Sequence, residues 1–67
     1  MTKEEIYLRI DAWIGAHSRA ALAGLLGITP PTLADRLSGR SKWKWEEICR
    51  LAEILNCSTD DLRALND

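Results

Sequence analysis

Apolar residues recur at intervals of three and four along most of the chain, which is the spacing of one face of an α-helix. No segment shows the strict alternation of apolar and polar residues that is typical of a strand. The first apolar stripe comprises Ile6, Ile10, Trp13, Ile14 and His17. It is preceded by Thr2 and Glu5, whose spacing predicts a capping box at the start of a helix.

Two short helices are predicted next, separated by a glycine. Ser18 is a suitable N-cap for a helix that contains residues 20–26, and Gly27 is placed to adopt the left-handed conformation that ends it. The third helix starts almost at once, at a pair of prolines. Proline suits the first turn of a helix, but a residue before proline avoids the helical conformation. This helix therefore begins at either Pro30 or Pro31.

The third helix is followed by a basic loop and a longer fourth helix. We expect Leu33 and Leu37 to face inward from the third helix, and Gly39 to stop it. The fourth helix runs over about residues 45–55 and ends at Asn56. Its expected buried face comprises Ile48, Leu51, Ala52 and Leu55.

A fifth, short helix closes the pattern. Ser58 is its expected N-cap, and its apolar contacts are Leu62 and Leu65. The five helices predict an all-α fold, and 67 residues leave room for a single domain, residues 1–67. A domain of this size buries only about 60% of the surface that its unfolded chain exposes, so we expect modest stability.

The charges are distributed unevenly along the chain. The net charge is −1, which by itself argues mildly against a nucleic-acid partner. Residues 45–67 hold six acids and two arginines. In residues 29–44 Asp35 is the only acid, and the basic residues are Arg36, Arg40, Lys42 and Lys44. This cluster is either a phosphate-binding face or a solvated one, and the acidic end of the chain is expected on another face.

The sequence carries no signature of metal, redox or enzymatic chemistry. Cys49 and Cys57 lack the spacing of a zinc site, and we expect reduced thiols that pack as small apolar residues in a cytoplasmic protein. No segment resembles a signal peptide or a membrane span. His17 has no motif relation to an acid or a nucleophile. We therefore expect no cofactor, no metal, no membrane partner and no enzymatic activity.

Residues 22–33 carry the most informative motif, which reads Leu-Ala-x-x-x-Gly-Ile-Thr-x-x-Thr-Leu. Ala23 is small enough for the next helix to cross closely, and Gly27 makes the turn. Ile28 and Leu33 fasten the two helices to the core. These constraints at fixed offsets predict a helix-turn-helix.

From Ser18 to Leu65 the chain resembles the phage-repressor and Cro-like helix-turn-helix family, also called XRE-type or lambda-repressor-like. The resemblance rests on two segments, LAGLLGITPPTLADRLSGR and EEICRLAEILNCSTDDL, and on five helices in the same order. It implies a compact five-helix domain with the helix-turn-helix at about residues 18–38. In this family the third helix lies in the major groove of duplex DNA, and the start of the second helix touches phosphates.

Carried over by position, the resemblance nominates three groups of DNA-binding residues. Ser18 and Arg19 would contact phosphates at the start of the second helix. The groove-facing residues would be Thr29, Pro31, Thr32, Asp35 and Arg36. The DNA backbone would be followed by Arg40, Lys42 and Lys44.

Some residues depart from the family pattern or leave their role open. Arg36 stands where the family often has an apolar residue, and the inward leucine comes one position later, at Leu37. Asp35 is either a base reader that accepts from cytosine N4 or a solvated helix residue. Trp43 and Trp45 are placed either to stack on unpaired bases or to pack at the entry to the fourth helix, and we expect packing.

The predicted function is that of a sequence-specific, duplex-DNA-binding transcriptional regulator of phage or mobile-element genes. One such module makes few base contacts, so we expect a homodimer that reads two half-sites. Its surface is expected on the acidic fourth and fifth helices, with apolar contacts from Tyr7, Leu8, Leu62 and Leu65. The alternative is a protein-interaction module on the same fold, an adaptor or the partner of an antirepressor or toxin. The net charge, the proline pair and Asp35 favour it.

Overall fold

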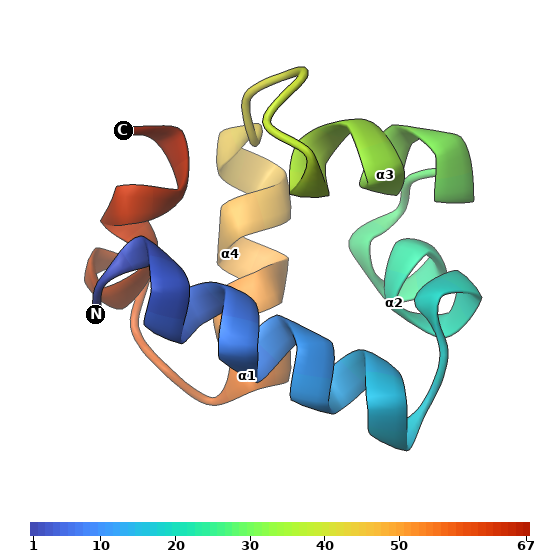
Figure 1. Cartoon of the computed structure of the whole chain (residues 1–67), viewed down its shortest axis with the longest axis horizontal. Coiled ribbons are helices and arrows are strands. Elements are labelled where there is room, and N and C mark those ends of the chain that lie inside the picture. Colours follow the sequence, from blue (N-terminus) through green and yellow to red (C-terminus); the bar gives the residue numbers. More distant parts are fainter.

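Five helices and no strand make up the structure (Figure 1). The computed structural model describes all 67 residues. The helices are α1 (Lys3–Ala16), α2 (Arg19–Leu26), α3 (Pro30–Leu37), α4 (Trp45–Leu55) and the 3-10 helix η1 (Asp60–Asn66). The predicted all-α fold and the order of its helices are confirmed. None of these helices combines the length and the apolar character needed to cross a membrane.

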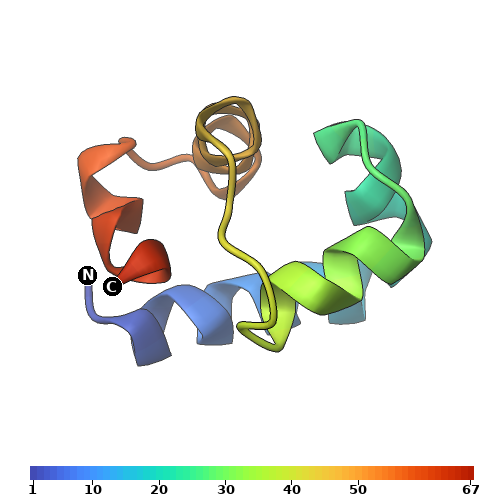
Figure 2. The ribbon, with the colours of Figure 1, turned by 90° about the horizontal axis from the view of Figure 1, so that it is seen from above.

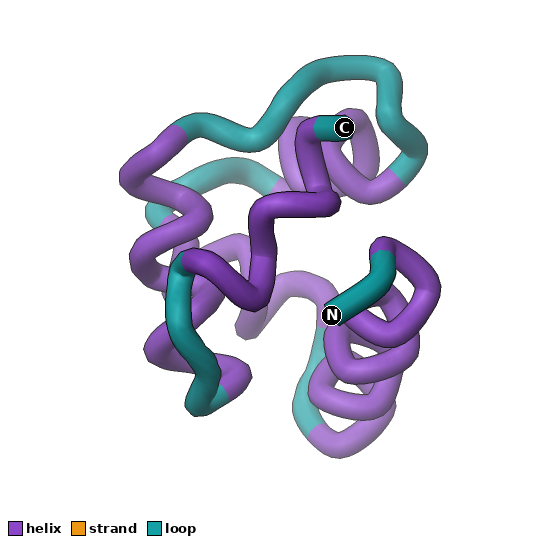
Figure 3. Tube along the Cα trace, turned by 90° about the vertical axis from the view of Figure 1, so that its left-hand side faces the viewer, coloured by secondary structure: helices purple, strands orange, loops and turns teal.

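The arrangement of the helices leaves α3 at the periphery. The backbone of α3 approaches that of α2, whereas α4 packs against α1, α2 and η1 (Figure 1). The C-terminal η1 packs against the N-terminal α1, so both chain ends lie on the same side of the molecule (Figure 2). Short loops connect all the elements (Figure 3). One long side of α3 is therefore free of neighbouring helices.

The predicted ends of α1, α2 and α4 are confirmed, whereas the N-cap of η1 is Thr59 and not the predicted Ser58. Thr2 Oγ1 accepts from Glu5 N, and Glu5 Oε1 accepts from Thr2 N, each at 3.2 Å. At the start of α2, Ser18 Oγ accepts at 2.9 Å from the backbone N–H three residues later. Left-handed residues end two helices, namely Gly27 after α2 (φ 74°) and Asn56 after α4 (φ 55°).

α3 begins at Pro30, which resolves the choice between the two prolines. Thr29 is extended (ψ 157°), and its Oγ1 accepts from Thr32 N at 3.4 Å. Pro30 and Pro31 fill the first two helical positions, where a backbone N–H would have no intrahelical partner. The helix stops before Gly39, which has a φ of 80°. The start of α3 therefore leaves no N–H unpaired among its first three residues, because the prolines have none and Thr32 N is bonded to Thr29.

A single core fills the space between the helices. Its members are Ile6, Ile10, Leu22, Ala23, Leu26, Leu33, Trp43, Ile48, Leu51, Ala52, Leu62 and Leu65. Four residues that we expected inside are only half-buried, namely Trp13, Ile14, Leu37 and Leu55. Each lies in the last turn of its helix, where the apolar stripe leaves the core.

Two expectations about the surface are wrong. Leu62 and Leu65 of η1 are 0% and 5% exposed, so they belong to the core and are not available to a dimer partner. Trp45 is 66% exposed because it is the first residue of α4 and its side chain extends into solvent, whereas Trp43 packs into the core as expected. Among the apolar contacts predicted for a dimer, Leu8 alone is exposed.

Candidate nucleic-acid interface

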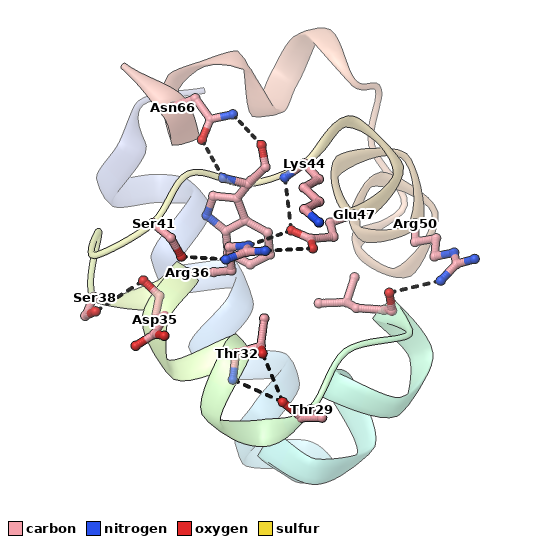
Figure 4. A network of polar contacts seen from close by, with 12 residues as sticks. Thr29, Thr32, Asp35, Arg36, Ser38, Ser41, Lys44, Glu47, Arg50 and Asn66 are labelled. Carbon is pink, nitrogen blue, oxygen red and sulfur yellow. Dashed lines mark hydrogen bonds and ion pairs between the residues drawn. The ribbon is translucent and has the colours of Figure 1, made fainter.

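The turn between α2 and α3 is fixed by backbone contacts and by α4. Ile28 N donates to Ala23 O at 3.0 Å, and the small Ala23 side chain is buried between the two helices. Arg50 of α4 donates from Nη1 to Leu26 O at 3.0 Å (Figure 4). A Cβ on Gly27 would collide with this guanidinium. The positive φ of Gly27 therefore favours glycine here, and a Cβ would also force the flexible Arg50 side chain to move.

The free side of α3 presents hydroxyl groups, a carboxylate and a proline ring. Thr29 and Pro31 are exposed, and Thr32 and Asp35 are partly exposed. Thr29 Oγ1 donates to Thr32 Oγ1 at 2.9 Å, which leaves the hydroxyl hydrogen of Thr32 free for an outside acceptor. Hydroxyl and carboxylate groups can bond to the edges of base pairs in a major groove. Four of the predicted groove-facing residues thus share one accessible side of the helix.

Arg36 does not belong to this side, and the prediction that it faces a groove is wrong. Its side chain is only 10% exposed, and its guanidinium binds Glu47 of α4 (Figure 4). The distances are 2.8 Å from Nε to Oε1 and 3.2 Å from Nη2 to Oε2. Arg36 follows Leu33 by three residues and therefore lies on the same, inward side of the helix. An ion pair replaces the apolar contact that the family pattern has at this position.

Glu47 is kept in its charged form by the contacts that it makes. Burial would raise the pKa of Glu47, but hydrogen bonds from Arg36 and from Lys44 N outweigh it, and the pKa lies below its ordinary value. The hydrogen bond from Arg36 to Glu47 raises the pKa of Arg36. Both groups are ionised at neutral pH, and because their charges cancel, Arg36 adds little to the positive potential of the surface.

Residues 38–44, here called the basic loop, join α3 to α4 beside the C-terminal end of α3 (Figure 1). Its exposed cations are Arg40, Lys42 and Lys44. Arg40 Nη1 lies 3.8 Å from Asp35 Oδ1, and because both side chains are well exposed this pair is weak. The three cations predicted to follow the DNA backbone are thus gathered in one segment at the end of α3.

The middle of the basic loop is anchored to the body of the protein. Arg36 Nη1 donates to Ser41 Oγ. Asn66 of η1 brackets the backbone of Trp43, because its Oδ1 accepts from Trp43 N and its Nδ2 donates to Trp43 O, both at 2.8 Å (Figure 4). The indole of Trp43 is buried, and its Nε1 has no hydrogen-bond partner in the protein. The loop is therefore ordered by contacts with α3 and η1.

The two residues predicted at the start of α2 lie apart from the basic loop. Ser18 is exposed, and its Oγ already accepts the N-cap hydrogen bond of α2. Arg19 is the exposed first residue of this helix. In Figure 1 α2 lies below the N-terminal end of α3, whereas the basic loop leaves the C-terminal end of α3. The predicted phosphate contacts therefore come from two separate elements.

Four residues that shape this surface are not among those predicted from the sequence, namely Lys3, Glu47, Arg50 and Asn66. Glu47 had a local signal, because a glutamate three residues after the N-cap, here Lys44, reaches back to its N–H. Lys3 lies beside Lys42 at a small cleft, and its Nζ donates to Asp67 O at 2.8 Å. The contacts of Lys3, Arg50 and Asn66 join residues more than 20 positions apart, which no local pattern reveals.

A second surface feature, a shallow apolar groove, lies between α1 and the C-terminal end of α4. It is lined by Arg9, Ala12, Trp13, Ile54 and Leu55. The ring of His17 stacks on that of Trp13, with 4.0 Å between centroids. No three His, Cys, Asp or Glu side chains converge as metal ligands. Both cysteines are free thiols, and burial raises the pKa of Cys57.

A family model described as a helix-turn-helix domain matches residues 8–65 of the chain. No curated protein and no solved structure matches it. The matched range includes α2, the turn, α3 and the basic loop, so it contains the whole candidate interface.

Proposed function

The chain belongs to the helix-turn-helix domain family, and on this premise we propose that it is a sequence-specific, duplex-DNA-binding regulator of transcription. Helix-turn-helix domains are typical of DNA-binding regulators. The observation that carries the proposal is the continuity between the free side of α3 and the basic loop. A helix with free polar groups, followed directly by three exposed cations, offers base contacts and phosphate contacts on neighbouring parts of one surface.

In the proposed complex α3 enters the major groove. Thr32 is the strongest candidate for a base contact, because its side chain is partly exposed and its hydroxyl accepts from Thr29, which leaves its own hydrogen free to donate. Pro31 would contact a thymine methyl group, and Asp35 would accept from cytosine N4. The cations of the basic loop, together with Arg19 on α2, would bind phosphates on either side of the groove.

The finer assignment is to a repressor or Cro-like regulator of phage or mobile-element genes that acts in the cytoplasm. The resemblance of residues 18–65 to that family supports it. A module with one short reading helix needs two half-sites for useful affinity, so we include a homodimer in the proposal. The burial of Leu62 and Leu65 moves the candidate dimer surface away from the inner side of η1.

The proposal is tested by titrating the purified protein with duplex DNA from its own gene neighbourhood, at two salt concentrations and with scrambled competitor. We expect one duplex to be preferred and the preference to survive the competitor. Thr32→Val, which removes one hydroxyl and keeps the shape, should cost roughly 1–3 kcal/mol of discrimination.

The matched control is Thr59→Val. Thr59 lies at the start of η1, and its side chain makes no cap hydrogen bond. The control should bind DNA like the wild type. Binding that is equal for all duplexes and is lost as salt rises, with no effect of Thr32→Val, would contradict the proposal, because any basic patch binds DNA in that way.

The second candidate function is a protein-interaction module, and one observation favours it. The groove between α1 and α4 is apolar and lies at the end of α4 that is farthest from the basic loop. Leu8 of α1 is also 69% exposed. If no duplex is preferred, a protein partner whose binding is weakened by Leu8→Ala would support this function.

A further inference from the structure

We propose that Glu47 is a positioning residue for the basic loop, which it presents to the DNA backbone in a fixed shape. The inference rests on the proposed function for the identity of the target. It extends that function by assigning a role to a residue that touches no DNA.

Glu47 connects three parts of the surface through one carboxylate. Its Oε1 accepts from Arg36 Nε at 2.8 Å and from Lys44 N at 3.0 Å, and its Oε2 accepts from Arg36 Nη2 at 3.2 Å. The third guanidinium nitrogen of Arg36 donates to Ser41 Oγ (Figure 4). The carboxylate of Glu47 thus holds the last turn of α3 and the end of the basic loop directly, and it holds Ser41 in the middle of the loop through Arg36.

Stability alone does not explain these contacts. The cost of removing two charges from water offsets much of their attraction, so apolar side chains of similar volume often stabilise a protein as well as a buried ion pair does. Apolar side chains cannot accept from Lys44 N or donate to Ser41 Oγ. The ion pair therefore supplies what an apolar pair lacks, which is a fixed path for the loop backbone.

The contacts of Glu47 leave the charged side chains of the basic loop free to bind phosphates. Arg40, Lys42 and Lys44 carry exposed side chains, and the network binds Lys44 only through its backbone N–H. Ser41 Oγ accepts from Arg36, so its own hydroxyl hydrogen remains available to a phosphate oxygen. A loop that is ordered before it binds loses less conformational entropy on binding, and this raises affinity without adding a contact.

The test uses the double variant Arg36→Met with Glu47→Leu, which removes one positive and one negative charge and leaves the net charge unchanged. We expect its thermal midpoint to remain close to that of the wild type. The backbone order parameters of residues 40–42 should fall from about 0.85 to below about 0.6. DNA affinity should fall by about tenfold, the cost of ordering one or two groups on binding.

The salt dependence of DNA binding shows whether the double variant binds more weakly because its loop is disordered or because the surface has lost positive charge. The double variant should bind more weakly at every salt concentration with nearly the same slope of log K against log salt, because all exposed cations remain. Lys42→Ala is the matched control, and it should reduce the slope by about one without changing the order parameters at neighbouring residues. If the double variant does not fold, the same measurements are made on Glu47→Gln, which keeps the shape and loses the charge.

The order parameters are independent of DNA, so the two proposals fail separately. A wild type that prefers no duplex would overturn the proposed target, while an ordered loop that becomes mobile in the variant would still support positioning. Equal order parameters and equal affinity in the variant and the wild type would overturn the role of Glu47, even if the protein binds an operator.

Discussion

Gly27 carries two constraints at the point where α2 turns into α3. Its φ of 74° disfavours any side chain, and a Cβ would displace Arg50 from Leu26 O. We expect Gly27→Ala to destabilise the protein by roughly 1–2 kcal/mol through the left-handed backbone alone, with a further loss from the broken hydrogen bond. Urea denaturation measures the effect.

Gly24 provides the matched control for this prediction. It lies inside α2, is exposed, and a Cβ there would meet no atom within 4 Å. Gly24→Ala should therefore stabilise the protein by roughly 0.5–1 kcal/mol. An equal effect of the two substitutions would contradict the role assigned to Gly27.

The burial of its ring and the hydrogen bonds of its backbone stabilise Trp43 in the core, whereas its indole N–H makes no hydrogen bond. Nε1 is buried without a partner, which costs roughly 1–3 kcal/mol, and Asn66 binds only the backbone of Trp43. Trp43→Phe should remain within about 1 kcal/mol of the wild type, since the relief at Nε1 offsets the smaller ring. Trp43→Ala should cost about 3–5 kcal/mol. A large loss in Trp43→Phe would show that Nε1 is satisfied.

The case of Arg36 shows why the sequence can predict the wrong side of a helix for a single residue. Both Arg36 and Leu37 follow Leu33 at helical spacing, at three and four positions, so either can face inward. Hydrophobicity favours Leu37. The structure places Arg36 inside because Glu47 satisfies its guanidinium, and this partner is eleven positions away in the sequence.

At the scale of the helices, the backbones of α3 and α4 do not approach closely, and the Arg36–Glu47 ion pair bridges them beside the apolar core. The folded protein holds the pKa of Glu47 below its ordinary value of 4.5. A carboxylate with a lowered pKa adds stability that is complete above the ordinary value and is lost as pH falls through the folded-state value. The connection between the two helices should therefore weaken below about pH 4.5.

Glu47→Gln tests this pH dependence. At pH 7 the variant should be less stable than the wild type by roughly 1.5–3 kcal/mol, the range for hydrogen bonds to charged groups. The difference should shrink as pH falls through the lowered pKa of Glu47, because the wild-type carboxylate then becomes protonated and neutral as well. Glu5 and Asp61 also have lowered pKa values through hydrogen bonds with Thr2 and Ser58, so part of the acid sensitivity will remain in the variant. A constant difference across this pH range would contradict the assignment.

The helices themselves were largely predictable from the sequence because their ends carry local signals. Thr2, Ser18 and Thr29 each bond to a backbone N–H three residues later, and Gly27 takes the left-handed conformation. The candidate site was less predictable. The exposed hydroxyl groups of α3 and the cations of the basic loop could be predicted from their positions in the sequence. The contacts that fix the basic loop could not, because they join residues distant in sequence.

At the scale of the whole molecule, exposed cations beside α3 give a protein of net charge −1 a surface suited to phosphates. Each phosphate contact lowers log K by about 0.9 per unit of log salt. Lys42→Ala should therefore reduce the slope by about one, whereas Arg63→Ala on η1 should leave it unchanged. If Lys42→Ala and Arg63→Ala gave the same slope of log K against log salt, the basic loop would not be the phosphate-binding surface.

Sequence-specific binding of duplex DNA is tested by letting the wild-type protein select duplexes from a random pool. The selection is made at about 0.15 M salt, where long-range charge attraction is screened. The account predicts one enriched motif that Thr32→Val weakens at a single base position. A pool that stays random after repeated selection would contradict sequence-specific binding and direct attention to the groove between α1 and α4.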